Sequence, residues 1–205
     1  SEIIRTANSQ LEISNCNQGS TASCGTSNNK QISFDMTGKY ATQFNTSSQV
    51  MEWYVNLSHT RSSLSGFGSG NYGVAYILGS TEQDFNSTTA QGYALLAGES
   101  GSPDNLRLVS FNGQPSNWSA VINSGVDFTQ NKRLSVKVTY DPSTNLWSLW
   151  VRDDGASFAD PTTITGTAVT ATNSTYTNLN LKYAGAFWNH GASCEEILKI
   201  DNMII

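Results

Sequence analysis

The segment 133–154 limits the possible folds more than any other part of the chain, because its apolar and polar residues alternate on both sides of a turn. Before the turn every second residue is apolar, as in a β-strand with one buried face. At 141–145, Pro142 fixes the backbone φ, and the flanking Asp and Asn side chains can bond nearby backbone. The chain then returns as a second strand at 146–152. The segment therefore predicts a β-hairpin.

The returning strand carries two tryptophans on opposite faces. Trp147 shares one face with Leu149 and Val151, which we predict to be the core face. Trp150 and Arg152 then lie on the outer face, and we expect Lys137 of the partner strand beside Trp150. A tryptophan on the solvent side of a sheet, among polar neighbours, indicates a binding surface more than a catalytic centre.

The composition is typical of an extracellular, loop-rich β-protein. Only 13% of the residues are charged, about half the usual share of roughly 25%, and Ser, Thr, Asn and Gly take their place. These four residue types are poor helix formers. The 205 residues suit a single domain, 1–205. A net charge of −5 disfavours nucleic acid as a partner, and no apolar stretch reaches the length of a membrane-spanning helix.

The three cysteines leave several pairings open. Cys16 and Cys24 bracket a short polar loop, and we expect a local disulfide between them in an oxidising compartment. In the competing interpretation, one of them pairs with Cys194, because the terminal strands of sandwiches often lie side by side. The remaining alternative is that all three cysteines are free thiols. Because the chain begins with Ser and shows no signal peptide, we expect a processed or trimmed segment.

Short strands with turn signals every ~8–12 residues run through the whole chain. The expected strands are 2–14 (one or two), 31–36, 40–44, 50–58, 72–79, 93–97, 106–111, 118–122, 181–188 and 196–205, besides the hairpin. The stretch 155–180 is of low complexity and has no clear expected structure. The pattern predicts an all-β fold, a two-sheet antiparallel sandwich or barrel. Most strands are expected to have one solvent-exposed and one buried face.

Several segments together carry a family resemblance. EWYVNL, NYGVAYILGST, GYALLAGESGS, LRLVSF, VTYDPSTNLWSLWVRDDG, YAGAFWNH and KIDNMII resemble a concanavalin A-like lectin/glucanase jelly roll. More narrowly, they are similar to modules of large secreted bacterial proteins, in which a terminal strand with an Asp-Asn-hydrophobic sequence pairs back near the N-terminus. The resemblance covers nearly the whole chain and implies a two-sheet antiparallel jelly-roll sandwich. It implies no single activity, because this fold hosts lectins, carbohydrate-binding modules, glycosidases and lyases.

The catalytic patterns of that fold are incomplete in this chain. Glycosidases that it resembles carry Glu-x-Asp-x-x-Glu on one strand, so that one carboxylate attacks while the other donates a proton. The nearest match here is Glu82-x-Asp84, followed by Ser87 where the second Glu is needed. Lyases of related fold need a Tyr or His base beside Arg, and His59 and Arg61 belong to no pattern that assembles them. We therefore expect no catalysis.

A carbohydrate site needs aromatic rings, on which sugar C–H faces stack, and polar groups that bond the hydroxyls. Trp53 and Trp147 fall on core faces. The candidate ligand-binding residues are Trp150, Lys137, Arg107, Arg152, Trp118, Trp188, Asn189 and His190. We expect Arg107 to share the outer face with Trp150 and Lys137, and basic groups there would suit an anionic glycan. For His190 the alternative is a residue of an ordinary polar loop.

Asp153 and Asp154 offer hard oxygen ligands for a structural Ca²⁺, with turn formation as the alternative. No other metal or organic cofactor is expected. The sequence thus predicts a secreted or cell-surface, non-catalytic module that binds a polysaccharide, with neighbouring domains of a larger protein as further partners. A polysaccharide-degrading enzyme of the same fold and a structural or adhesion module without a glycan ligand are the alternatives.

Overall fold

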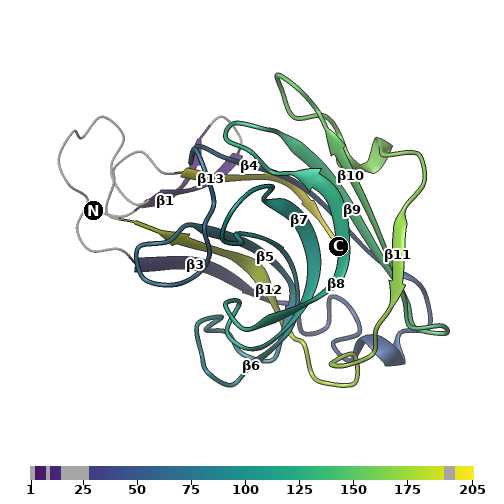
Figure 1. Ribbon diagram of the computed structural model, residues 1–205. Coiled ribbons are helices and arrows are strands. Elements are labelled where there is room, and N and C mark those ends of the chain that lie inside the picture. Colours follow the sequence, from purple (N-terminus) through teal and green to yellow (C-terminus); the bar gives the residue numbers. More distant parts are fainter. Residues whose placement is uncertain (1–2, 8–9, 15–27, 192–196) are drawn as a thin grey trace.

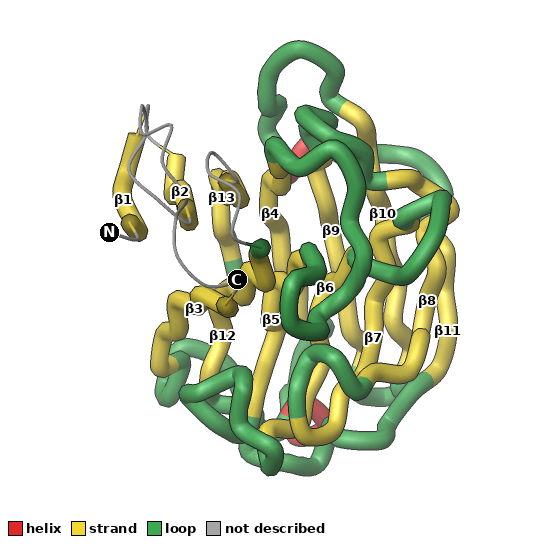
Figure 2. Tube along the Cα trace, turned by 60° about the vertical axis from the view of Figure 1, so that its left-hand side comes forward, coloured by secondary structure: helices red, strands yellow, loops and turns green. Residues whose placement is uncertain are grey.

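The structure is a computed structural model that describes residues 3–7, 10–14, 28–191 and 197–205 (Figure 1). Two antiparallel sheets face each other. The seven-stranded sheet has, in spatial order, β1 (Ile3–Ala7), β2 (Gln10–Ser14), β13 (Ile197–Ile204), β4 (Met51–His59), β9 (Leu134–Asp141), β10 (Leu146–Asp153) and β11 (Val169–Thr172). The six-stranded sheet has β3 (Asn28–Asp35), β12 (Tyr183–His190), β5 (Gly73–Ser80), β6 (Ala90–Ala97), β7 (Asn105–Gly113) and β8 (Trp118–Asp127). Both orders can be followed in Figure 2.

The predicted all-β sandwich is confirmed. The described residues contain only two helical turns, η1 (Phe44–Thr46) and η2 (Pro161–Thr163), and both are 3₁₀. The expected return of the terminal strand is also confirmed, because β13 pairs with β2 near the N-terminus and with β4 on its other side. Among the described residues, no helix is long and apolar enough to cross a membrane.

The predicted hairpin forms two neighbouring strands of the seven-stranded sheet, between β4 and the edge strand β11. β9 and β10 are joined by the expected turn, in which Asn145 takes a left-handed φ of 55° and accepts a hydrogen bond from the Tyr140 hydroxyl at 2.8 Å. Trp147 and Leu149 are buried as predicted, while Val151 is only half-buried. Trp150 lies on the outer face. The period-two pattern therefore assigned the faces of this hairpin correctly.

Aromatic rings fill one part of the core between the sheets. Trp53 and Trp147 stack with ring centroids 5.9 Å apart, and Phe44 packs against both rings and against Tyr93. Burying one such side chain removes roughly 150–250 Å² from water, which contributes on the order of 4–6 kcal/mol. Phe44 reaches this place from η1. The expected strand at 40–44 is therefore wrong, since the chain turns inward there to bury Phe44.

The inner strands of the six-stranded sheet, β12, β5 and β6, are buried on both faces, which the sequence did not predict. Alternate residues of β5 face the core between the sheets, and the others belong to a second apolar cluster on the outer side. Phe67 and Phe85, from the loops before and after β5, take part in this cluster. Strands approach closely here: a Cβ on Gly92 would lie 1.9 Å from the carbonyl oxygen of Gly79. Only glycine fits at position 92.

Two further expectations about elements need correction, and one cannot be compared. β8 extends from Trp118 to Asp127, well beyond the expected 118–122. The low-complexity stretch 155–180 contains η2 and β11, because β11 pairs with the first half of β10. Cys16, Cys24 and Cys194 lie outside the described residues, so their pairing stays a prediction.

Candidate functional site

The outer face of the seven-stranded sheet is polar, in contrast to the covered outer face of the other sheet. Directly opposed residues in an antiparallel sheet point to the same side. Three rows of such residues cross β4, β9 and β10: Glu52–Thr139–Ser148, Tyr54–Lys137–Trp150 and Asn56–Ser135–Arg152. We call the middle row, Tyr54–Lys137–Trp150, the aromatic row. It places two aromatic side chains on either side of one ammonium group.

The aromatic row is held together by contacts of the lysine. The Lys137 Nζ lies 5.1 Å from the ring centroid of Tyr54 and 5.3 Å from that of Trp150, both within cation–π range. Nζ also lies 3.1 Å from Oε1 of Glu52, whose Oε2 accepts a hydrogen bond from the Tyr54 hydroxyl at 2.7 Å. These contacts fix the orientation of both rings.

The same contacts keep both charged groups ionised. Hydrogen bonding to Tyr54, and then to Glu52, raises the pKa of Lys137. The hydrogen bond from Tyr54, with a smaller contribution from Lys137, lowers the pKa of Glu52. At neutral pH the aromatic row and the adjacent Glu52 therefore present an ammonium donor and a carboxylate acceptor side by side.

Trp150 is half-buried and anchored at its polar end. Its Nε1 donates a hydrogen bond to the carbonyl oxygen of Gly166 at 3.1 Å. A pocket of about 220 Å³ adjoins it, lined among others by Arg152, Thr165 and Thr167. This is smaller than the roughly 300–1,000 Å³ of typical ligand pockets, so it suits one ring or substituent of a longer ligand.

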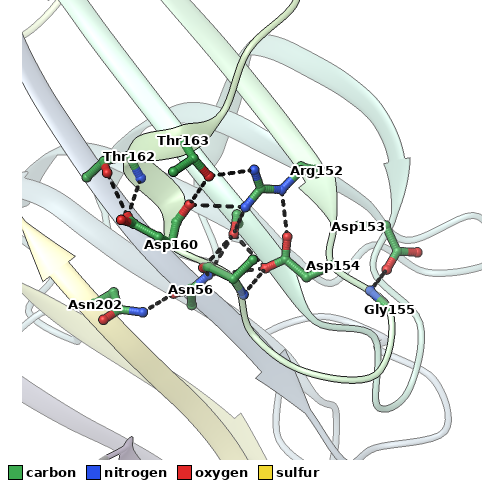
Figure 3. A network of polar contacts seen from close by, with 11 residues as sticks. Asn56, Arg152, Asp153, Asp154, Gly155, Asp160, Thr162, Thr163 and Asn202 are labelled. Atoms are coloured by element: carbon green, nitrogen blue, oxygen red, sulfur yellow. Dashed lines mark hydrogen bonds and ion pairs between the residues drawn. The ribbon is translucent and has the colours of Figure 1, made fainter.

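Arg152, predicted to contact ligand, takes part in a network of hydrogen bonds within the protein (Figure 3). Its Nε donates to Oδ1 of Asp154 at 2.7 Å, and its terminal nitrogens donate to Ser135, Thr163 and the carbonyl oxygen of Asp160. The Asp154 side chain is fully buried. Arg152 therefore holds the 154–163 loop on the outer face of the sheet, through four hydrogen bonds of its guanidinium group.

The two aspartates suggested for calcium point to different partners. Oδ2 of Asp154 accepts hydrogen bonds from the Ser135 hydroxyl and from the Ala159 backbone N–H. Asp153 lies apart from this network in Figure 3, where it accepts from the Gly155 N–H and is ion-paired with Lys132 at 3.4 Å. Within the described parts of the chain, no group of three or more His, Cys, Asp or Glu is placed to hold a metal ion. The turn alternative describes these two residues better.

Arg107 does not lie beside Trp150, contrary to expectation. It is a residue of β7 in the six-stranded sheet, whereas Trp150 is in the seven-stranded sheet. The prediction was wrong because alternation gives the face of a strand but not the sheet to which the strand belongs. Arg107 forms an ion pair with Glu99, and its guanidinium lies 5.6 Å from the ring centroid of the half-buried Trp118. Arg107 and Trp118 thus form a separate surface.

Three neighbouring residues of β12 that were predicted to bind ligand are buried. Trp188 is completely buried, and Asn189 and His190 are 5% and 1% exposed. They belong to the strand rather than to a polar loop, because β12 continues to His190 between β3 and β5. Asn189 has a structural role, since its Nδ2 donates to backbone carbonyl oxygens of the Gly66–Asn71 loop.

The residues considered for catalysis are poorly placed for it. Glu82 and Asp84 lie in the 81–89 loop, not on a strand, and the Asp84 carboxylate caps its own turn by accepting from the Asn86 N–H. His59 is completely buried, and burial lowers its pKa. The Arg61 guanidinium stacks on the Tyr72 ring at 3.7 Å. This geometry offers no open base beside a carboxylate-binding group.

A second pocket, of about 430 Å³, lies between β3 and the end of β13. Its walls include the exposed Phe34, Met203 and Ile205 side chains. Such a lining suits an apolar ligand rather than a sugar. The aromatic row, with its ring faces, donor and acceptor, is the better candidate for polar, hydroxyl-rich ligands.

Sequence reasoning missed two members of the site, Glu52 and Tyr54. The signal was present, because alternation along 50–58 places both on the outer face of that strand. The sequence did not show which strand lies beside this one. β4 pairs with β9, from which it is separated by about eighty residues of chain.

Comparison with known proteins gives a match at the level of structure only. No protein-family model matches the chain, and no curated protein sequence matches it. Among solved structures, the basic winged bean lectin with Tn-antigen superposes with a TM-score of 0.56 at 12% identity, over 98% of this chain and 87% of the lectin. The chain has a lectin-type jelly-roll fold. The resemblance to concanavalin A-like jelly rolls is therefore confirmed.

Two other solved structures show the range of this likeness. The CBM2 module of the Lactobacillus casei BL23 phage J-1 evolved Dit has a TM-score of 0.53 at 9% identity, over 99% of this chain and 78% of that one. Alginate lyase PA1167 from Pseudomonas aeruginosa has a TM-score of 0.49 at 10% identity, over 100% and 85%. At such identities the likeness establishes the fold alone.

Proposed function

We propose that this chain is a non-catalytic module that binds a polysaccharide through the aromatic row. The observation that carries the proposal is the placement of Tyr54 and Trp150 on either side of Lys137, on a polar sheet face. Aromatic faces stack on sugar C–H faces, while Glu52 and Lys137 can accept from and donate to hydroxyl groups. The carbohydrate-binding module and lectin among the structural neighbours support this function.

The spacing of the row favours a chain of several sugars over a single one. Tyr54 and Trp150 are two strands apart, roughly 10 Å at the usual strand spacing of ~4.8 Å. Two rings of one oligosaccharide can contact the two aromatic side chains at once. Affinity should therefore increase with chain length until both aromatic positions are occupied.

The test is a pair of tryptophan variants in a polysaccharide gel-shift or calorimetric screen. Trp150→Ala should weaken binding by about 1–3 kcal/mol, the range for a well-placed anchor. Trp118→Ala is the matched control, because Trp118 is also half-buried but lies in the other sheet. Loss of binding in Trp118→Ala with full binding in Trp150→Ala would move the site to the six-stranded sheet.

An assay for reaction products in the same binding samples tests whether the protein is non-catalytic. Neither reducing ends nor unsaturated products should appear over hours of incubation with plant or algal polysaccharides. The structural support is the position of Glu82 and Asp84 in a loop whose turn they stabilise. Steady product release that disappears in Glu82→Gln would show an enzyme instead.

We also infer that residues 1–205 form one module of a secreted or cell-surface protein. The low share of charged residues, with Ser, Thr, Asn and Gly in their place, supports an extracellular location. The continuous apolar cluster between the two sheets supports a single unit. Neighbouring domains of a larger protein would then be its covalent partners.

A further inference from the structure

We propose that the polysaccharide bound by the aromatic row is neutral, not anionic. This inference rests on the function proposed above and reverses the expectation that basic residues select an acidic polymer. It follows from where the carboxylates of the outer face lie relative to its cations.

Each basic side chain that the described strands β2, β4, β9, β10 and β13 place on this face has a carboxylate partner. Lys137 pairs with Glu52 at 3.1 Å, Arg152 with Asp154 at 2.7 Å, and Lys199 with Glu12 at 3.4 Å. Lys199 belongs to this face because it lies opposite Ser58 of β4 and Glu12 of β2. Arg107, the other basic residue considered for an acidic ligand, is also paired, with Glu99. An anionic ligand would have to displace a carboxylate at each of them.

Two of the three partners cannot turn away to solvent. The Asp154 side chain is 0% exposed and that of Glu12 is 3% exposed. Only Glu52, at 44%, can leave its lysine readily. A buried carboxylate that loses its cation is strongly destabilised, so displacement at Arg152 or Lys199 would weaken the fold.

Further carboxylates lie on the same face. Besides the three partners, Asp141, Asp160 and Asp201 belong to the same face: Asp141 at the end of β9, Asp160 at the start of η2 and Asp201 opposite Asn56. The whole chain adds a formal charge of −5. A polyanion would therefore approach against the field of the protein, which slows association and lowers affinity.

A neutral polymer meets none of these costs. The Lys137–Glu52 pair gives a donor and an acceptor without net charge, and hydroxyl groups can bond to both while the pair stays intact. Tyr54 and Trp150 supply the ring faces. The site is thus matched to hydroxyl-rich, uncharged rings.

The experiment compares each neutral polymer with its own charged derivative. Laminarin, xylan and galactomannan are titrated beside their carboxymethylated forms at 50 and 500 mM NaCl. We expect the neutral form of whichever backbone binds to do so at least about tenfold more tightly, with little change in Kd between the two salt concentrations, because no screened charge pair is formed. Tighter binding of the carboxymethylated form, weakened by salt, would overturn the inference and leave the proposed function standing. Binding of neither form would overturn the proposed function and the inference together.

A charge variant tests the reason as well as the result. Glu52→Gln removes the one exposed partner and leaves Lys137 free to meet a carboxylate, so the preference for the neutral form should shrink several-fold. Glu82→Gln makes the same change of charge in the loop that joins β5 to β6 of the six-stranded sheet. This variant should leave the preference unchanged. An unchanged preference in Glu52→Gln would show that the Lys137–Glu52 pair does not set the ligand charge.

Discussion

At the scale of single residues, Trp147 and Trp150 of β10 lie on opposite faces of one strand and differ in burial. Trp147 is fully buried among Trp53, Tyr93 and Tyr140, and its Nε1 donates to the carbonyl oxygen of Asn173 at 3.0 Å. Trp150, three positions later, points to the opposite side and is half-buried beside Lys137. The burial of Trp147 indicates a role in packing, and ligand contact is the role proposed for Trp150.

Replacing each tryptophan by alanine should separate these roles. Trp147→Ala should lower the free energy of unfolding by roughly 3–5 kcal/mol, the cost of a large cavity in the core. Trp150→Ala should lower it by only about 1 kcal/mol, mainly through the lost hydrogen bond to Gly166. Urea unfolding of both variants measures the difference. Equal losses of stability would mean that Trp150 is as much a packing residue as Trp147.

At the scale of elements, the outer face of β4, β9 and β10 depends on a loop that folds over one end of it. Asn56 connects the network of Arg152 and Asp154 to the C-terminal strand, because its Oδ1 accepts from Nδ2 of Asn202 at 2.6 Å and its Nδ2 donates to Ser135. Figure 3 shows these contacts converging where β4, β10, the loop and β13 meet. The network fixes the edge of the surface on which the aromatic row lies.

Breaking this network on one side should cost more than removing both charges. Arg152→Met leaves the buried Asp154 carboxylate without its cation and should lower the free energy of unfolding by roughly 2–3 kcal/mol. Arg152→Met combined with Asp154→Asn should recover part of that loss, since no charge stays buried. Thermal or urea unfolding of the single and double variants checks this. A double variant less stable than Arg152→Met would contradict the ion-pair explanation.

At the scale of the whole molecule, the two sheets have different roles. The inner strands of the six-stranded sheet have an apolar cluster on each face, so this part of the sheet lies in the interior of the protein. The seven-stranded sheet has one apolar and one polar face, and its polar face carries the candidate site. The N-terminal strand β2 and the C-terminal strand β13 are neighbours in the seven-stranded sheet, where Ser14 of β2 lies opposite Ile197 of β13.

The cysteine prediction belongs to this scale because it concerns how the chain ends are tied. Mass spectrometry after alkylation of the native protein should find one disulfide, Cys16–Cys24, and one free thiol, Cys194. The opposition of Ser14 and Ile197 makes a bridge to Cys194 the informative alternative, since both strands lead to cysteine-containing segments. Detection of a Cys194 peptide linked to Cys16 or Cys24 would contradict the local loop and show that the terminal segments are cross-linked.

The sequence by itself determined the local features of this protein. Alternation between Leu134 and Arg152 depends only on the two-residue period of a strand, so it predicted the hairpin, its buried face and the outward position of Trp150. Turn residues at 141–145 fixed the connection, because their backbone preferences are intrinsic. A series of such strands was enough for the fold class, and the resemblance narrowed it to the jelly roll.

Only the tertiary structure decided which strands are neighbours, and the errors follow from that. It placed Arg107 in the other sheet, buried Trp188 in the middle of β12, and brought Glu52 and Tyr54 next to Lys137. It also paired Lys137, Arg152 and Lys199 of the outer face with carboxylates. Period-two patterns carry no information on long-range pairing, because register and sheet order depend on packing across the whole core. The composition of the site, and with it the charge of the ligand that suits it, is therefore a property of the folded molecule.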